Sequence, residues 1–154
     1  MKFIVSRLLA TLVFACTMVG CGTPDPASSV KSVEIEDIFN RTEVRIPMRD
    51  GTHLFTVILS PKDQGDQALP FILSRTPYGT AGWGGTSGII YGFRELIKEG
   101  YIFVLQDIRG RYDSEGEFIM NRAACEVRDD SCIDEASDTH DSVDWLLANV
   151  PNNN

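Results

Sequence analysis

Two short runs of alternating apolar and polar residues begin the body of the chain. They span residues 42–47 and 53–59, and the sequence Arg49-Asp50-Gly51-Thr52 lies between them. Alternation with a period of two is typical of a strand that buries one face. An Asp-Gly turn between two such runs predicts a β-hairpin.

Two nearly continuous apolar runs follow, at residues 69–74 and 101–105. Such runs are typical of strands that are buried on both faces. A glycine-rich loop is expected over residues 76–88. Residues 89–98 carry apolar side chains at helical spacing, and Gly100 is a suitable C-terminal stop for that helix.

The last periodic segment, residues 135–150, predicts a second helix that ends at Pro151. Its expected buried face carries Val143, Leu146, Leu147 and Val150, and its expected solvent face carries Asp138, Asp141 and Asp144.

Buried strands that alternate with helices after an opening hairpin indicate an α/β domain with a mainly parallel sheet. In such sheets the functional groups lie beyond the carboxyl ends of the strands. Two loops of this chain are expected there, residues 76–88 and 108–118.

Composition and charge restrict the classes of function. The chain has 154 residues, which is enough for one domain, with 43% apolar and 23% charged residues. Its net charge of −8 argues against binding to nucleic acid, because that function needs a basic surface. No run reaches the roughly 18 apolar residues of a membrane span.

The N-terminus has the pattern of an export signal. Lys2 and Arg7 precede a mostly apolar core at residues 8–19, which is too short to span a bilayer. The sequence Met18-Val19-Gly20-Cys21 resembles the lipobox of bacterial lipoproteins, in which the cysteine is acylated and becomes the new N-terminus. We therefore expect a protein that is exported in a bacterium and anchored by lipid at Cys21 to the cell envelope, in the outer membrane or periplasm. An ordinary secretory signal is the alternative.

These signals divide the chain into three parts: a signal peptide at 1–20, a tether at 21–39 and a folded domain at 40–154. Export also affects the cysteines. Cys125 and Cys132 remain after cleavage and lipidation, and an oxidising compartment favours a disulfide between them. A metal site is the weaker interpretation, because no Cys-x-x-Cys pair or neighbouring histidine pair supplies further ligands.

A series of motifs allows a more specific interpretation of the sequence. In chain order they are Arg45-Ile46-Pro47-Met48-Arg49-Asp50-Gly51-Thr52, Arg75-Thr76-Pro77-Tyr78-Gly79, Gln106-Asp107-Ile108-Arg109-Gly110-Arg111, Ser114-Glu115-Gly116-Glu117-Phe118 and Asp141-Ser142-Val143-Asp144-Trp145-Leu146. Their order and spacing over residues 40–154 resemble the start of the X-prolyl dipeptidyl-peptidase/cocaine esterase family of α/β-hydrolases. That family also includes α-amino-acid ester hydrolases.

The resemblance implies a serine hydrolase that attacks an ester, amide or peptide carbonyl and needs neither a metal nor a cofactor. It implies a triad in the order Ser, Asp, His, and an oxyanion hole with one donor from the backbone after the serine. The second donor in this family is a tyrosine hydroxyl in the loop after the third strand, and by motif that residue is Tyr78. Because Pro77 restricts the backbone beside it, Tyr78 is suited to hold an O–H donor in place.

Other residues have less specific roles. Trp83, in the glycine-rich loop, could line an acyl pocket or simply pack against the domain. For Asp107, Arg109 and Arg111, an ion pair that braces the loop after the strand is favoured over anion binding.

No Gly-x-Ser-x-Gly elbow is present in the sequence. The closest segments surround Ser87 and Ser114, and His53 and His140 are the two histidines. We do not assemble a triad from these residues, since the family's Ser, Asp and His would lie downstream of Asn154. We therefore expect that the 154-residue chain alone does not hydrolyse esters, and that a sheet edge left exposed lowers its stability and promotes association.

The leading hypothesis is thus the N-terminal portion of an exported serine hydrolase for esters, amides or peptides. The alternative is a non-catalytic lipoprotein domain that binds a ligand or a partner, for example through the Trp83 loop. The hydrolase hypothesis requires a nucleophile elbow after this part of the chain, and the alternative does not.

Overall fold

The computed structural model describes residues 35–81, 86–127, 129 and 131–154, with Ser87, Ile90 and Tyr91 described by their backbone. The predicted signal peptide, Cys21 and Trp83 lie outside the described residues. Within the described part, no helix combines the length and the apolar character needed to cross a membrane.

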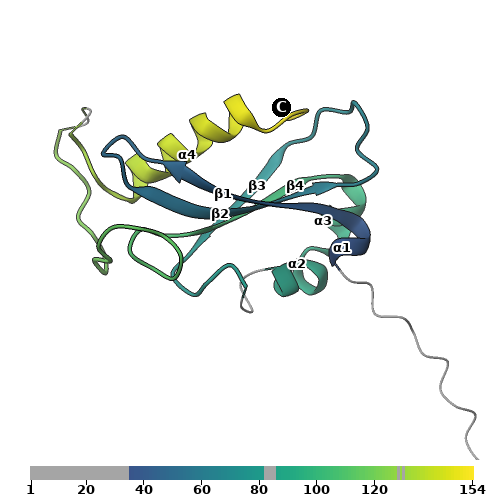
Figure 1. Ribbon diagram of the computed structural model, residues 1–154, viewed down its shortest axis with the longest axis horizontal. Helices are drawn as coiled ribbons and strands as arrows, with labels where there is room; N and C mark the ends of the chain where they lie inside the picture. The colour runs from purple at the N-terminus through teal and green to yellow at the C-terminus, as the bar shows by residue number, and fades with distance from the viewer. Residues whose placement is uncertain (1–34, 82–85, 128, 130) are drawn as a thin grey trace, which may run out of the picture. The chain divides into compact units, whose positions relative to one another are not determined.

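The centre of the fold is a mixed four-stranded sheet (Figure 1). Its strands are β1 (Phe39–Pro47), β2 (His53–Pro61), β3 (Phe71–Thr76) and β4 (Ile102–Asp107), in the order β1-β2-β4-β3. The first two pairings are antiparallel, and β3 pairs in parallel with β4. The two apolar strands, β3 and β4, form the parallel pair, and β4 lies beside the predicted hairpin of β1 and β2.

The hairpin closes as the sequence predicts. Met48 donates its N–H to Thr52 O (2.8 Å), and Gly51 donates its N–H to Met48 O (2.9 Å). Gly51 has a φ of +83°, which a residue with a Cβ rarely adopts. Ile46 pairs with Leu54 across the hairpin, and both side chains are buried.

Helices cover both faces of the sheet (Figure 1). The helix α4 (Glu135–Asn149) lies on one side, and α1 (Ile35–Ile38), α2 (Thr86–Gly92) and α3 (Arg94–Glu99) lie on the other. Two buried apolar clusters correspond to these layers. One joins Leu146 of α4 to the sheet, and the other joins Ile35 of α1 and Ile89 of α2 to it.

The described fold begins at Ile35, which is earlier than the expected boundary at residue 40. Ile35 and Phe39 are buried, and the Phe39 ring meets the Phe103 ring edge to face at 5.7 Å. The end of the predicted tether 21–39 therefore belongs to the folded unit, because its two apolar residues complete the core.

The single helix predicted over residues 89–98 is wrong, because two helices occupy this segment. The backbone leaves the helical conformation at Phe93, with φ −119° and ψ 28°. The Phe93 ring lies 6.1 Å from that of Phe103, and Gly92 before it has low helix propensity. The apolar spacing was correct, but it did not reveal this break.

The expected faces of α4 need correction. Leu146 and Val150 are buried as predicted, but Leu147 is 49% exposed, and Asp138 and Ser142 are buried. The buried stripe thus contains polar groups whose partners lie elsewhere in the chain. Asp134 begins the helix as a capping box: its carboxylate accepts the Ser137 N–H, and its own N–H donates to Ser137 Oγ.

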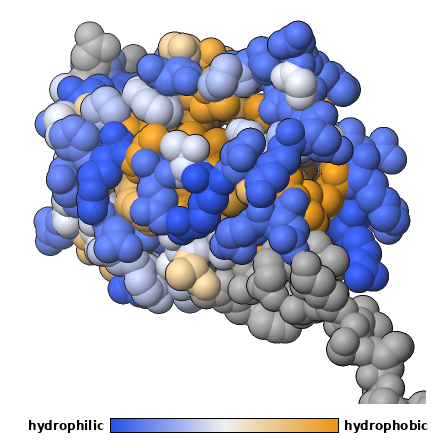
Figure 2. All heavy atoms as spheres, turned by 45° about the vertical axis from the view of Figure 1, so that its right-hand side comes forward, coloured by the Kyte–Doolittle hydropathy of each residue, from blue (hydrophilic) through white to orange (hydrophobic). Residues whose placement is uncertain are grey.

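Strand β3 is the outer strand of the described sheet, so one of its edges has no neighbouring strand there. Five of its six residues are half-buried, whereas all six of β4 are buried. Figure 2, turned to bring the side of α1 and α3 forward, shows apolar surface left uncovered between hydrophilic side chains. Beside the start of β3, Leu69 forms a parallel bridge with Asn153.

Candidate functional site

Tyr78 lies immediately beyond the carboxyl end of β3. Thr76, the last residue of the strand, is buried, and its Oγ1 accepts the Tyr78 N–H at 3.1 Å. Pro77 fixes φ between them. The Tyr78 side chain is 74% exposed. The fold therefore holds the backbone of this residue and leaves its phenol accessible.

The two loops expected at this edge of the sheet are in contact. Ile108 N–H donates to Thr76 O at 3.2 Å, and Arg111 Nε donates to Pro77 O at 3.0 Å. Gly79 has a φ of +91°, and a Cβ there would lie 3.1 Å from the Tyr112 ring. Both loops begin at the carboxyl ends of strands, as predicted, and the structure adds that these two strands are parallel neighbours.

Arg111 contacts Pro77, Tyr112 and Phe118 at the carboxyl ends of β3 and β4. Besides its hydrogen bond to Pro77 O, its guanidinium lies 5.4 Å from the centre of the Tyr112 ring and 5.0 Å from that of the Phe118 ring. Both distances are in the range of cation–π attraction. Arg111 thus fixes the peptide before Tyr78 against the loop that follows β4.

A hollow of about 420 Å³ opens beside Tyr78. Pro77 and Tyr78 form one wall, residues 118–122 form another wall, and Ile108 and Glu135 complete the lining. Small-molecule sites in proteins span roughly 300–1,000 Å³, so its size suits a small organic group.

Asp107 is the last residue of β4 and is fully buried. Asp113 N–H donates to Oδ2 at 3.4 Å, while Oδ1 has no hydrogen-bond partner among the described residues. Burial raises the pKa of this carboxyl, and the backbone N–H groups of Asp113 and Thr80 lower it in part. Asp107 therefore braces the loop through backbone contacts and does not pair with Arg109 or Arg111.

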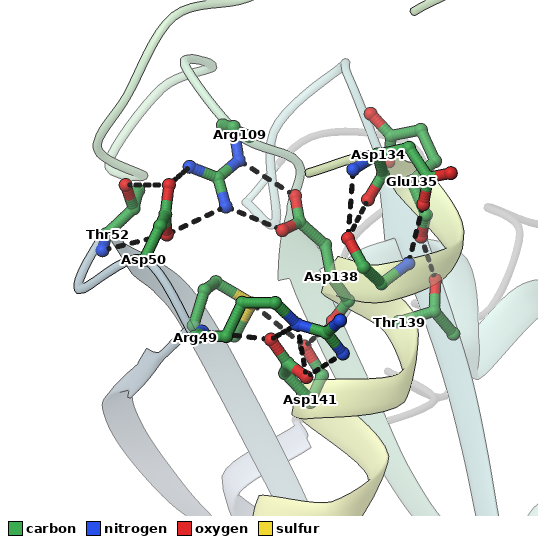
Figure 3. A network of polar contacts seen from close by, with 12 residues as sticks. Arg49, Asp50, Thr52, Arg109, Asp134, Glu135, Asp138, Thr139 and Asp141 are labelled. Atoms are coloured by element: carbon green, nitrogen blue, oxygen red, sulfur yellow. Dashed lines mark hydrogen bonds and ion pairs between the residues drawn. The ribbon is translucent and has the colours of Figure 1, made fainter. Parts of the chain in front are cut away.

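Arg109 is the centre of a buried polar network (Figure 3). It lies between Asp138 of α4 and Asp50 of the hairpin turn. Its Nη2 donates to Asp138 Oδ1 at 2.6 Å and its Nη1 to Asp50 Oδ2 at 2.6 Å, and each carboxylate accepts a second bond. The hydrogen bond from Arg109 lowers the pKa of Asp50. Arg109 does brace this loop through ion pairs, but its partners are Asp138 and Asp50 and not Asp107, so the network joins three distant segments.

A second arginine pair lies beside the first (Figure 3). Arg49 Nη2 and Nε donate to the Asp141 carboxylate at 2.7 and 3.0 Å, and the Arg49 N–H donates to Oδ2 at 2.9 Å. These hydrogen bonds lower the pKa of Asp141. Both pairs attach α4 to the turn between β1 and β2, so they fix the position of α4 relative to the sheet.

A third arginine, Arg75 of β3, is oriented from within the strand. Its Nε donates to Gln106 Oε1 at 2.8 Å, and its Nη1 donates to Thr139 Oγ1 at 2.6 Å and to the carboxylate of Glu135 at 3.0 Å. These contacts fix the end of β3, immediately before Tyr78, against the first turns of α4.

The described serines and histidines make no triad. His53 Nδ1 lies 3.1 Å from Glu115 Oε2, and His140 Nδ1 lies 3.2 Å from Asp144 Oδ2. Ser114 Oγ donates to Asp107 O at 2.6 Å and accepts the Phe55 N–H at 2.8 Å. Its hydroxyl is thus engaged by two backbone groups.

Cys125 and Cys132 form a disulfide, with their Cα atoms 5.8 Å apart. Asp134 lies close to both sulfur atoms, but its carboxylate accepts the backbone N–H groups of Cys125 (3.0 Å) and Ser137 (2.8 Å). Because both sulfurs are bonded to each other, this set is better suited to bracing the start of α4 than to holding a metal ion.

Sequence reasoning missed Asp138 as a buried partner of Arg109. Asp138, Ser142 and Leu146 are spaced by four residues and so occupy one stripe of α4. That spacing was available in the sequence, but an acidic residue is normally assigned to the solvent face. The pairing with Arg109 reverses this assignment.

Residues 50–154 match the family described as X-Pro dipeptidyl-peptidase (S15 family). A cocaine esterase of Rhodococcus sp. (strain MB1 Bresler) is 31% identical over 106 residues, which are 69% of this chain and 16% of that protein.

Among solved structures, an aminopeptidase from a marine sediment Thaumarchaeota archaeon has a TM-score of 0.63 and 33% identity, over 86% of this chain and 23% of that one. An alpha-amino acid ester hydrolase has a TM-score of 0.64 and 34% identity, over 88% of this chain and 23% of that one. The chain thus spans less than a quarter of the length of each of these relatives.

Proposed function

This chain belongs to the X-Pro dipeptidyl-peptidase (S15) family, and on that premise we propose that it supplies half of the active site of a serine hydrolase. The half it supplies is the scaffold of the oxyanion hole, with the Tyr78 hydroxyl as donor. The reaction is attack by a serine on an ester or amide carbonyl, and the Tyr78 hydroxyl stabilises the negative charge that develops on the carbonyl oxygen.

The position of Tyr78 is the observation that carries this proposal. Its backbone is held by Thr76, by Pro77 and, through the Pro77 carbonyl, by Arg111. Its phenol is exposed beyond the carboxyl ends of the strands, where α/β proteins place their functional groups. A fixed donor of this kind typically contributes roughly 10²–10³ in rate, because it needs no reorganisation as charge develops.

The Leu69–Asn153 bridge supports a place for the nucleophile. Leu69 N–H donates to Asn152 O at 3.0 Å, and Asn154 N–H donates to Leu69 O at 3.1 Å, in a parallel register. A strand that continues in this direction runs along the free edge of β3, and its carboxyl end comes beside Tyr78. We place the serine there, on the strand-to-helix elbow of the family, with its Asp and His later in the chain.

The relatives narrow the substrate to carbonyl compounds of two kinds. Two of them are named as ester hydrolases and one as an aminopeptidase. We propose esters and amides, including peptides, as the substrate class of the complete protein. The proposed cellular location is the bacterial envelope, through lipid at Cys21, and it is supported by the pattern of the first 21 residues.

A fluorophosphonate probe tests the proposal, because it labels activated serines. The complete product of the gene is incubated with the probe, and the labelled peptide is identified by mass spectrometry. The 154-residue chain is the matched control. We expect labelling of a serine beyond residue 154 in the complete product and none in the control. An unlabelled complete product, or labelling of Ser87 or Ser114, would refute the proposal.

A further inference from the structure

The hollow beside Tyr78 is rich in exposed apolar side chains. Met120 is 74% exposed and Ile119 is 43% exposed, and both line it together with Tyr78. Large apolar side chains that gather around a concavity, instead of being scattered over the surface, are a mark of a ligand site.

The charged groups of the lining already have partners within the chain. Arg122 Nη2 donates to Glu117 O at 3.0 Å, and the Glu135 carboxylate accepts Arg75 Nη1 at 3.0 Å. The two groups have opposite charges, so the lining carries no net charge that would favour a charged occupant. The hollow is therefore suited to an uncharged aliphatic or aromatic group.

Arg111 connects the two walls. It binds Pro77 O on the wall that contains Tyr78, and its guanidinium lies against the ring of Phe118 on the other wall. These contacts within the chain fix the two walls relative to each other, which reduces the ordering cost of binding.

We infer that this hollow is the subsite for the apolar substituent of the substrate carbonyl. The inference rests on the proposed function, because it takes Tyr78 as the group that binds the carbonyl oxygen. Since Tyr78 is itself part of the lining, a carbonyl held there places a neighbouring substituent against Phe118, Ile119 and Met120. The preferred substrates are then esters or amides with an uncharged apolar group larger than acetyl or methyl.

The test narrows the hollow and compares substrates with the complete protein. Met120→Trp adds bulk to one wall, and Leu147→Trp adds the same bulk to an exposed apolar position of α4 that does not line the hollow. Methyl acetate, methyl butanoate and methyl phenylacetate vary the acyl group. Methyl, butyl and benzyl acetate vary the leaving group.

We expect Met120→Trp to lower kcat/KM about tenfold or more for the larger esters of either the acyl series or the leaving-group series. The kcat/KM for methyl acetate should change by no more than about twofold. The series that responds identifies the substituent that the hollow receives. Met120→Ala should shift the preference toward the larger members. An equal effect on all esters, no effect on either series, or the same pattern with Leu147→Trp would overturn the inference.

A second readout separates this inference from the proposed function. Binding of neutral benzyl acetate is measured by saturation-transfer NMR, which needs no turnover. If the complete protein hydrolyses no ester, the proposed function fails. Loss of the benzyl acetate signal in Met120→Trp, with retention in Leu147→Trp, would still establish the hollow as an apolar site. Equal binding by all three proteins, or by none, would refute it.

Discussion

Replacement of Arg109 by methionine should lower the stability of the fold more than any other substitution proposed for this protein. The arginine donates two hydrogen bonds to Asp138 and two to Asp50, and so ties α4 to the hairpin turn. Methionine preserves much of the apolar stem and removes the charge. The substitution therefore isolates the electrostatic contribution of the network from its packing.

The magnitude follows from the burial of each partner. The side chains of Arg109 and Asp138 are 6% and 3% exposed, whereas that of Asp50 is 29% exposed. Loss of the cation leaves a buried carboxylate whose remaining counterion is Arg75 Nη2, at 3.8 Å. Breaking a buried pair in this way costs about 3–5 kcal/mol. Asp50→Asn should cost about 1 kcal/mol, since solvent screens the outer pair.

The assay is urea denaturation of the 154-residue chain at pH 7, followed by far-UV circular dichroism. We expect Arg109→Met to lower the free energy of unfolding far more than Asp50→Asn does. In the double variant Arg109→Met/Asp138→Leu, most of the loss should be recovered, because no unpaired charge remains buried. Additive losses in the double variant, or equal losses for Arg109→Met and Asp50→Asn, would refute the reasoning.

Three further changes test other parts of the account. Burial raises the pKa of Asp107, so its contribution to stability is lost as the pH rises from the unfolded value of about 3.9 through the higher pKa of the folded state. Asp107→Asn should therefore stabilise the protein by about 1 kcal/mol at pH 7, measured as a higher Tm, and should have little effect near pH 3. A Tm gain that does not depend on pH would contradict this cause. Cys132→Ser should lower the unfolding free energy by about 2–3 kcal/mol, and a reducing agent should affect only the parent protein. Cys21→Ser should abolish incorporation of radiolabelled palmitate in a bacterial host, while continued incorporation would exclude Cys21 as the lipidated residue.

Local patterns were sufficient to predict the elements that position the candidate site. The hairpin was correct because alternation and an Asp-Gly turn are both local signals. The two apolar runs were correctly assigned as strands of a parallel arrangement, with functional loops at their carboxyl ends, and the structure shows that they are neighbours. The position of Tyr78 at this edge follows from that topology and needs no further information.

The errors concern tertiary partners. Asp138 was assigned to solvent because its partner, Arg109, lies 29 residues away in the loop after β4. At the helix break, the ring of Phe93 lies beside that of Phe103 in β4, a contact that local apolar spacing does not reveal. The hollow was not predicted either, because its walls come from segments that only folding brings together.

The most direct test of the central claim is the kinetic effect of Tyr78→Phe in the complete product of the gene. The substitution removes one hydroxyl from an exposed ring, so stability should not change. We predict that kcat for methyl butanoate falls about 10²–10³-fold, with little change in KM, because the hydroxyl acts on the transition state. An undiminished kcat in a folded Tyr78→Phe protein would show that Tyr78 is not the oxyanion donor.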